Sequence, residues 1–228
     1  MKLLAICLLI MSLLDINPDS YKSNKKVSID GGSLNDTTFS NLKNIDIKFM
    51  LRGYFYALSS IEDKDAPGGF GGSDNKAKKI SENKQLESVH GLKLIIDTTS
   101  HIDFAEKFKG QKVYLINKSG VDTGFEASDS RLSIAAEAFY KGTWSSIEYL
   151  PSSWCGNSYH KVYLKNNEYW EFNVPRYLGQ IKVKLRYRLD AGPGNKLYSN
   201  VVTAFINKKQ FSVKQGHSPN TIMDPYND

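Results

Sequence analysis

The chain has 228 residues, of which 40% are hydrophobic and 24% are charged, so it can fold around a core of its own. Its formal net charge is +6, but lysine and arginine are spread along the sequence and are not gathered on one module. This distribution argues against a nucleic-acid-binding protein. The 13 tyrosines, 11 phenylalanines and 17 glycines favour strands and turns over helices.

The N-terminus has a lysine followed by an apolar run from Leu3 to Leu14. The run is shorter than the roughly 20 apolar residues that a spanning helix needs, and it is typical of a secretory signal. We expect residues 1–20 to be a signal peptide and the mature protein to be secreted or periplasmic, without a membrane span. An uncleaved anchor is the alternative. If the signal peptide is removed, Cys155 is the sole remaining cysteine, and we expect its thiol to be buried.

Residues 21–43 are polar and turn-rich and predict a flexible lead-in. Alternating apolar residues over 45–52, followed by 54–58, predict a long strand with a bend at Gly53. Residues 59–86 are rich in glycine and charge, which predicts a mobile insertion. Its glycines lack the Lys-Ser/Thr that follows a phosphate-binding loop.

Strands are predicted over 92–97, 112–117 and 132–138, with one helical turn between the first two, at 102–108. Lys141 and Gly142 then make a tight connection to a hairpin partner at 144–149.

Two further strands, 161–164 and 168–172, flank Asn166-Asn167, a pair that tolerates positive φ. Residues 181–189 show the clearest alternation in the chain. Ile, Val, Leu, Tyr and Leu fall on one face, and Lys182, Lys184, Arg186 and Arg188 fall on the other. We expect the charged face to be solvated and paired with acidic residues of a neighbouring strand, or else to bind an anionic polymer.

A last strand candidate covers 197–206, and residues 214–228 are expected to fray. Many short strands without βαβ alternation predict an all-β fold, an antiparallel β-sandwich formed by residues 44–213 as a single domain. We expect an immunoglobulin-like Greek key without an intersheet disulfide. We also expect a monomer.

The segment Cys155 to His160 combines a thiol, an amide and an imidazole, and a Cys–His pair can catalyse acyl transfer. No family signature surrounds it. Paired glutamates could instead serve a glycosidase, and the candidates are Glu137, Glu148, Glu168 and Glu171. The histidine and cysteine spacing matches no metal-binding motif, so we expect neither a metal nor another cofactor.

Aromatic residues crowd the stretch from Tyr140 to Tyr177 and could form a platform for sugar rings or for a protein. Because Tyr169 and Trp170 alternate, we expect one of them to be exposed. Together with the charged stripe, these residues give the predicted binding site: Trp154, Asn157, Tyr159, Trp170, Lys182, Lys184, Arg186 and Arg188.

Residues 137–206 contain Gly142-Thr-Trp, Ile147-Glu-Tyr, Ser153-Trp-Cys-Gly-Asn-Ser-Tyr, Lys184-Leu-Arg and Tyr198-Ser-Asn. This pattern resembles uncharacterised secreted bacterial β-sandwich proteins. The resemblance implies a cell-envelope setting and no activity.

The sequence therefore predicts an exported, non-catalytic binding module that recognises a glycan or a surface protein. The alternatives are a secreted hydrolase that uses Cys155 or paired glutamates, and a structural cell-envelope protein.

Overall fold

The fold is given by a computed structural model that describes residues 34–153, 155–192 and 194–212. Within them, 50% of residues lie in strands and 11% in helices. The expected signal peptide (1–20) and the expected frayed tail (214–228) lie outside the described residues.

Helices are short. They are α1 (Asp36–Asn41) and the 3-10 helices η2 (Ile80–Glu82), η3 (Lys84–Leu86), η4 (Gly156–Ser158) and η5 (Lys208–Phe211). The α1 helix lies in the expected lead-in, and the side chain of Asn35 caps it by accepting a hydrogen bond from Thr38 N at 2.8 Å. Each helix of the described ranges is too short or too polar to cross a bilayer.

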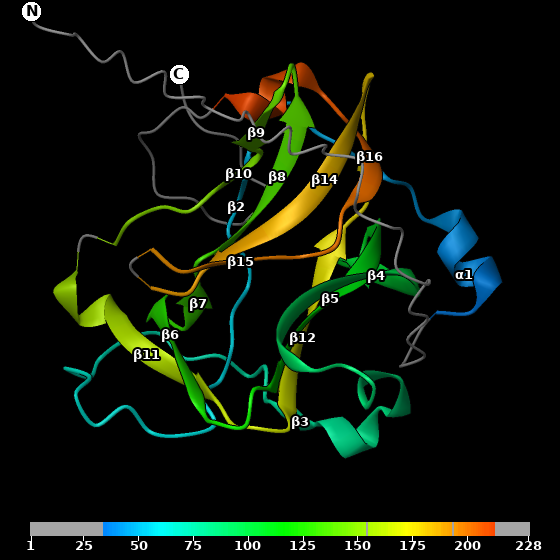
Figure 1. The fold of residues 1–228 in the computed structure, drawn as a ribbon. Helices are drawn as coiled ribbons and strands as arrows, with labels where there is room; N and C mark the ends of the chain where they lie inside the picture. The colour runs from blue at the N-terminus through cyan, green and yellow to red at the C-terminus, as the bar shows by residue number, and fades with distance from the viewer. Residues whose placement is uncertain (1–33, 154, 193, 213–228) are drawn as a thin grey trace, which may run out of the picture.

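A five-stranded antiparallel sheet occupies the upper half of Figure 1. Its strands are β8 (Ile134–Tyr140), β9 (Thr143–Ser146), β14 (Ile181–Asp190), β15 (Lys196–Tyr198) and β16 (Val202–Ile206). Strand β14 lies at its centre, with β8 on one side and both β15 and β16 on the other. The predicted alternating strand at 181–189 is therefore confirmed.

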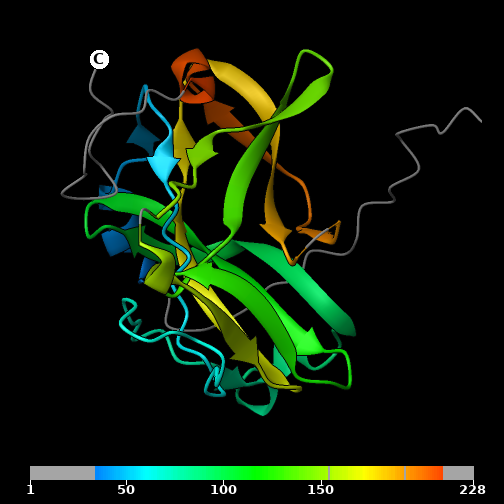
Figure 2. The ribbon, with the colours of Figure 1, turned by 90° about the vertical axis from the view of Figure 1, so that its left-hand side faces the viewer.

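Two more antiparallel sheets lie below the first (Figures 1 and 2). The four-stranded sheet contains β3 (Lys78–Lys79), β12 (Glu168–Pro175), β5 (Phe108–Lys118) and β4 (Gly91–Phe104). The three-stranded sheet contains β11 (Tyr159–Leu164), β6 (Thr123–Ser128) and β7 (Arg131–Leu132). Two parallel pairs of two residues each complete the described strands: β1 (Ile45–Asp46) with β13 (Tyr177–Leu178), and β2 (Leu51–Arg52) with β10 (Glu148–Tyr149).

The inner faces of the three larger sheets share one hydrophobic core. Strand β14 contributes Val183, Leu185, Tyr187 and Leu189, each at most 5% exposed. Trp170 of β12 and Phe125 of β6 enter the same core. Burying a side chain of this size contributes about 1.5–3 kcal/mol, so the apolar face of β14 is a major source of stability.

The four-stranded sheet is also covered on its other side. Tyr114, Ile116 and Tyr169 pack there against Ile80 of η2 and Leu86 of η3. This second layer explains why alternation on β12 exposes neither aromatic ring: Tyr169 is 3% exposed and Trp170 is 0% exposed.

Turn chemistry was predictable in part. The hairpin between β8 and β9 is confirmed, with Lys141 at φ 52° and Gly142 at φ 84°. Asn167 has the expected positive φ of 63°, but β11 and β12 on either side of it belong to different sheets.

The prediction of a helical turn at 102–108 was wrong, because these residues close the hairpin between β4 and β5. Ala105 and Glu106 form its turn at φ 53° and 59°. Pairing across the hairpin, which places Phe104 opposite Phe108, overrides the local helical spacing.

Several hydrogen bonds attach the glycine-rich segment 59–86, expected to be mobile, to the sheets. Ser60 N donates to Tyr163 O at 2.8 Å, and Lys161 N donates to Asp63 Oδ2 at 2.8 Å. Farther along, Gly71 N donates to Asp129 Oδ1 at 2.9 Å. The segment therefore lies against β11 and against the turn that follows β6, and it contains β3 and the helices η2 and η3.

The alternation of β14 leads to a direct stability test. Leu185→Asp places a carboxylate in the core and should lower the free energy of unfolding by several kcal/mol. The control Lys184→Asp lies one residue away on the exposed face and should change it by less than about 1 kcal/mol. Urea unfolding of the two variants measures the difference, and equal destabilisation would contradict this assignment of faces.

Candidate functional site

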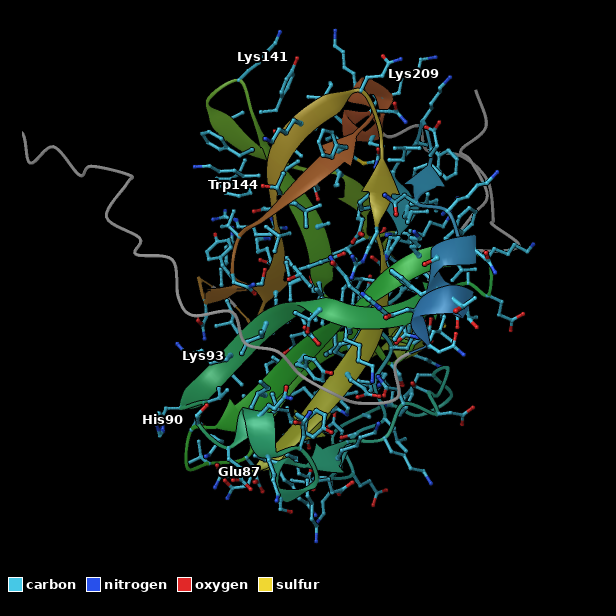
Figure 3. The ribbon with its side chains drawn as sticks, turned by 90° about the vertical axis from the view of Figure 1, so that its right-hand side faces the viewer. Glu87, His90, Lys93, Lys141, Trp144 and Lys209 are labelled. Carbon is cyan, nitrogen blue, oxygen red and sulfur yellow. The ribbon has the colours of Figure 1, made fainter. Side chains whose placement is uncertain are left out.

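The outer face of the five-stranded sheet gathers cations and aromatic rings. We call it the cation–aromatic face and define it by residues from five strands: Phe139 of β8, Trp144 of β9, Lys182, Lys184, Arg186 and Arg188 of β14, Tyr198 of β15 and Phe205 of β16. Phe139, Tyr198 and Phe205 are 37%, 42% and 46% exposed. Trp144 lies at the margin of this sheet (Figure 3). Several large exposed rings gathered on one face are unusual on a surface that binds nothing.

Arg186 is the cation of this face that contacts two aromatic rings. Its guanidinium carbon lies 4.0 Å from the ring centre of Trp144 and 3.8 Å from that of Tyr198. Its Nε donates to Glu137 Oε2 at 2.9 Å. Contacts with two rings and a carboxylate restrict the side chain to one orientation, which leaves little entropy to lose when a partner binds.

The expected counter-charge for the stripe is present on two strands. Glu137 of β8 accepts from Arg188 Nη1 at 2.6 Å as well as from Arg186, and Asp190 pairs with Arg188 at 3.2 Å. Among the described residues, no acidic side chain forms an ion pair with Lys182 or Lys184. One end of the face is therefore neutralised, and the other end keeps two positive charges.

The remaining residues of the predicted site lie elsewhere. Trp154 lies outside the described residues. Asn157 of η4 and Tyr159 of β11 are exposed, Tyr159 by 47%, but β11 belongs to the three-stranded sheet and η4 directly precedes it. Trp170 is in the core, where Nε1 donates to Leu58 O at 3.1 Å, so we correct its choice as a binding residue.

Sequence reasoning missed Phe139, Tyr198 and Phe205. Their signal was in the register: Phe139 and Tyr198 lie opposite Lys184 and Arg188, and Phe205 lies opposite Lys182. Pairing between distant strands cannot be read from one strand alone.

Comparison with known proteins gives no relative: no family model, curated protein or solved structure matches this chain.

The described contacts do not join the residues suggested for hydrolysis to one another. Cys155 is exposed, which corrects the expected burial, and the hydrogen-bonding contacts of the His160 ring are to Ser130 Oγ at 3.4 Å and Ser158 O at 3.1 Å. The glutamates divide among strands β8, β10 and β12, and Glu171 of β12 is paired with Lys78 and Lys112. Within the described ranges, no three His, Cys, Asp or Glu side chains lie close enough together to hold a metal ion.

Glu148 lies at the centre of a buried polar cluster. Its Oε1 accepts from Tyr54 at 2.6 Å and from Tyr177 at 2.9 Å, and its Oε2 accepts from Ala136 N at 2.9 Å. The hydroxyl of Tyr187 lies 3.4 Å from that of Tyr54. Burial raises the pKa of Glu148 from 4.5 to about 7, although these three donors act in the opposite direction.

The raised pKa makes stability depend on pH. Because folding raises the pKa of this acid, its contribution is fully present below pH 4.5 and is lost as the pH rises through about 7. This loss is about 3 kcal/mol. Glu148→Gln cannot ionise, so its free energy of unfolding should fall less than that of the wild type between pH 5 and pH 8. Urea unfolding at the two pH values measures this fall. An equal fall in the variant and the wild type would contradict the assignment.

The exposure of Cys155 gives a second test. Its thiol should react with Ellman's reagent in the native protein as fast as it does in urea, because an exposed thiol is accessible without any unfolding. Reaction only after unfolding would show that the thiol is covered.

Proposed function

We propose that the protein is an exported, non-catalytic binding module that recognises an acidic patch on a protein partner through the cation–aromatic face. The observation that carries this proposal is the Arg186 side chain held between Trp144, Tyr198 and Glu137, beside two lysines without an acidic partner in the described chain. Tryptophan, tyrosine and arginine are the residues that most often anchor protein interfaces.

Apolar surface favours a protein over a sugar at this face. Phe139 and Phe205 are 37% and 46% exposed and carry no polar group on their side chains. Sugars need hydroxyl partners beside each ring, whereas protein interfaces bury a hydrophobic centre within a polar rim. Lys182 and Lys184 would supply that rim and steer an acidic partner towards it.

We also propose an immunoglobulin-like Greek key as the finer description of the β-fold, a monomeric state, export directed by residues 1–20, and a relation to secreted bacterial β-sandwich proteins. The hydrolase alternative has weaker support, because the described contacts join neither Cys155 to His160 nor one glutamate to another. A structural envelope protein is the alternative that leaves the exposed rings unexplained.

Charge reversal on the face tests the proposal. Immobilised wild-type protein should retain a specific protein from a surface extract of the producing organism. Lys182→Glu/Lys184→Glu should weaken the affinity for that purified protein about tenfold or more, because like charges would then meet. Biolayer interferometry gives the dissociation constants.

The matched control is Lys161→Glu/Lys165→Glu, which makes the same change of charge at two exposed lysines outside the face. It should bind as the wild type does. Equal loss in both variants would indicate a net-charge effect, and equal binding by all three proteins, or no retained protein, would contradict the proposed face.

A further inference from the structure

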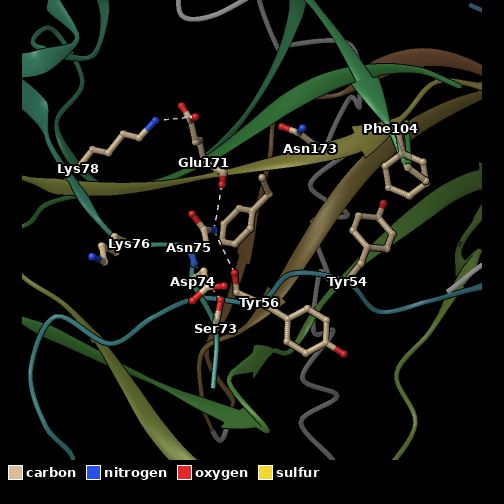
Figure 4. A pocket seen from close by; sticks show the side chains of 12 residues that line it. Tyr54, Tyr56, Ser73, Asp74, Asn75, Lys76, Lys78, Phe104, Glu171 and Asn173 are labelled. Atoms are coloured by element: carbon tan, nitrogen blue, oxygen red, sulfur yellow. Dashed lines mark hydrogen bonds and ion pairs between the residues drawn. The ribbon is translucent and has the colours of Figure 1, made fainter. Parts of the chain in front are cut away.

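A cleft of about 610 Å³ lies away from the cation–aromatic face, beside β12. Figure 4 shows its walls, which come from the chain after β2, from residues 73–78, from the end of β4 and from β12. No single stretch of the sequence predicts this cleft, because its segments are far apart along the chain. Its volume is within the range of small-molecule sites.

One wall is aromatic. Tyr54, Tyr56 and Phe104 line it, and the rings of Tyr54 and Phe104 meet edge to face with centres 5.2 Å apart. The hydroxyl of Tyr54 points inward to Glu148, which fixes its ring beside the cleft. Tyr56 is 37% exposed, so its ring can contact a ligand directly.

The facing wall is polar and built on a fixed support. Asn75 Nδ2 donates to Tyr56 O at 3.0 Å and to Glu171 O at 3.1 Å, which joins the two walls. Asp74 and Asn173 place carboxylate and amide groups in the cleft. Such groups can bind pairs of hydroxyls, donating to one and accepting from another.

The charges of this cleft nearly cancel. Lys78 and Glu171 form an ion pair at 2.7 Å, and Lys76 and Asp74 contribute one charge of each sign. Two carboxylates would repel a phosphate or sulfate in this cleft. An alkyl chain would displace water from the charged wall and leave its charges poorly solvated. The balance favours an uncharged polar ligand.

A second cleft, of about 440 Å³, continues from the first and shares Lys78, Glu171 and Asn173 with it. The two clefts together, which we call the trough, extend from Tyr56 to Tyr169 of β12 and Lys112 of β5. A ligand longer than one ring can therefore lie along it.

We propose that this trough binds a short neutral oligosaccharide. Sugar rings have an apolar C–H face, which would pack on Tyr56 and Tyr54, and a rim of hydroxyls, which would reach Asp74 and Asn173. The site is separate from the cation–aromatic face, so either site can bind whether or not the other does.

Calorimetric or NMR titration at millimolar sugar tests this inference, with cellobiose, maltotriose and N,N′-diacetylchitobiose as neutral probes and a sulfated disaccharide as the anionic comparison. At least one neutral probe should bind more tightly than the sulfated one. Tyr56→Ala should weaken that binding about tenfold, because a ring contact is lost. Binding of none of the neutral probes, or preference for the sulfated sugar, would overturn the proposal.

Tyr198→Ala is the matched control, since it removes an exposed tyrosine ring from the cation–aromatic face. It should leave the sugar affinity unchanged and weaken binding of the protein partner. Tyr56→Ala should weaken sugar binding and leave binding of the protein partner unchanged. Loss of sugar binding in Tyr198→Ala but not in Tyr56→Ala would place the sugar on the other face and overturn the inference. Thermal melts of both variants check that each is folded.

Discussion

The structure depends most on the two-sided character of strand β14. Its odd-numbered residues from Val183 to Leu189 are buried against the other sheets, and its even-numbered residues form the centre of the cation–aromatic face. A shift of register by one residue would put four cations in the core and expose the apolar face, which gives the pairing with β8 and β16 a strong energetic preference. Stability and the proposed binding surface therefore have one origin: the core that holds β14 also sets the position of Arg186.

A buried carboxylate connects this core to the second proposed site. Glu148 joins β10 to β8 through Ala136 N and to the chain after β2 through Tyr54. Desolvating a carboxyl is costly, and the hydrogen bonds of Tyr54, Tyr177 and Ala136 offset only part of that cost, as its raised pKa indicates. In return, Tyr54 is held in one position, with its hydroxyl inside and its ring beside the cleft. The cluster thus acts as a fold element and as a support for the aromatic wall.

Local patterns predicted what local physics decides. The alternation of 181–189, the turn at Lys141 and Gly142 and the need for acidic partners opposite the arginines followed from spacing alone. Contacts between distant strands did not. Trp144 and Tyr198 meet at Arg186 from two different strands, and Trp170 is buried because β12 lies between two packed layers. The helical spacing at 102–108 was misleading because hairpin pairing outweighs it. The cleft beside β12 combines four separated segments, and no single stretch of sequence carries its signal.

The most direct test of the account is the state of the Arg186 side chain in solution, before any partner is added. Two rings within about 4 Å should shift its Cδ protons strongly upfield in NMR spectra, and its Nε–H, which donates to Glu137, should exchange slowly with water. Upfield shifts and a protected Nε–H would show that the face is organised in the free protein. Random-coil shifts with rapid Nε–H exchange would mean that the cation–aromatic face is not preformed, and the binding proposal based on it would fail.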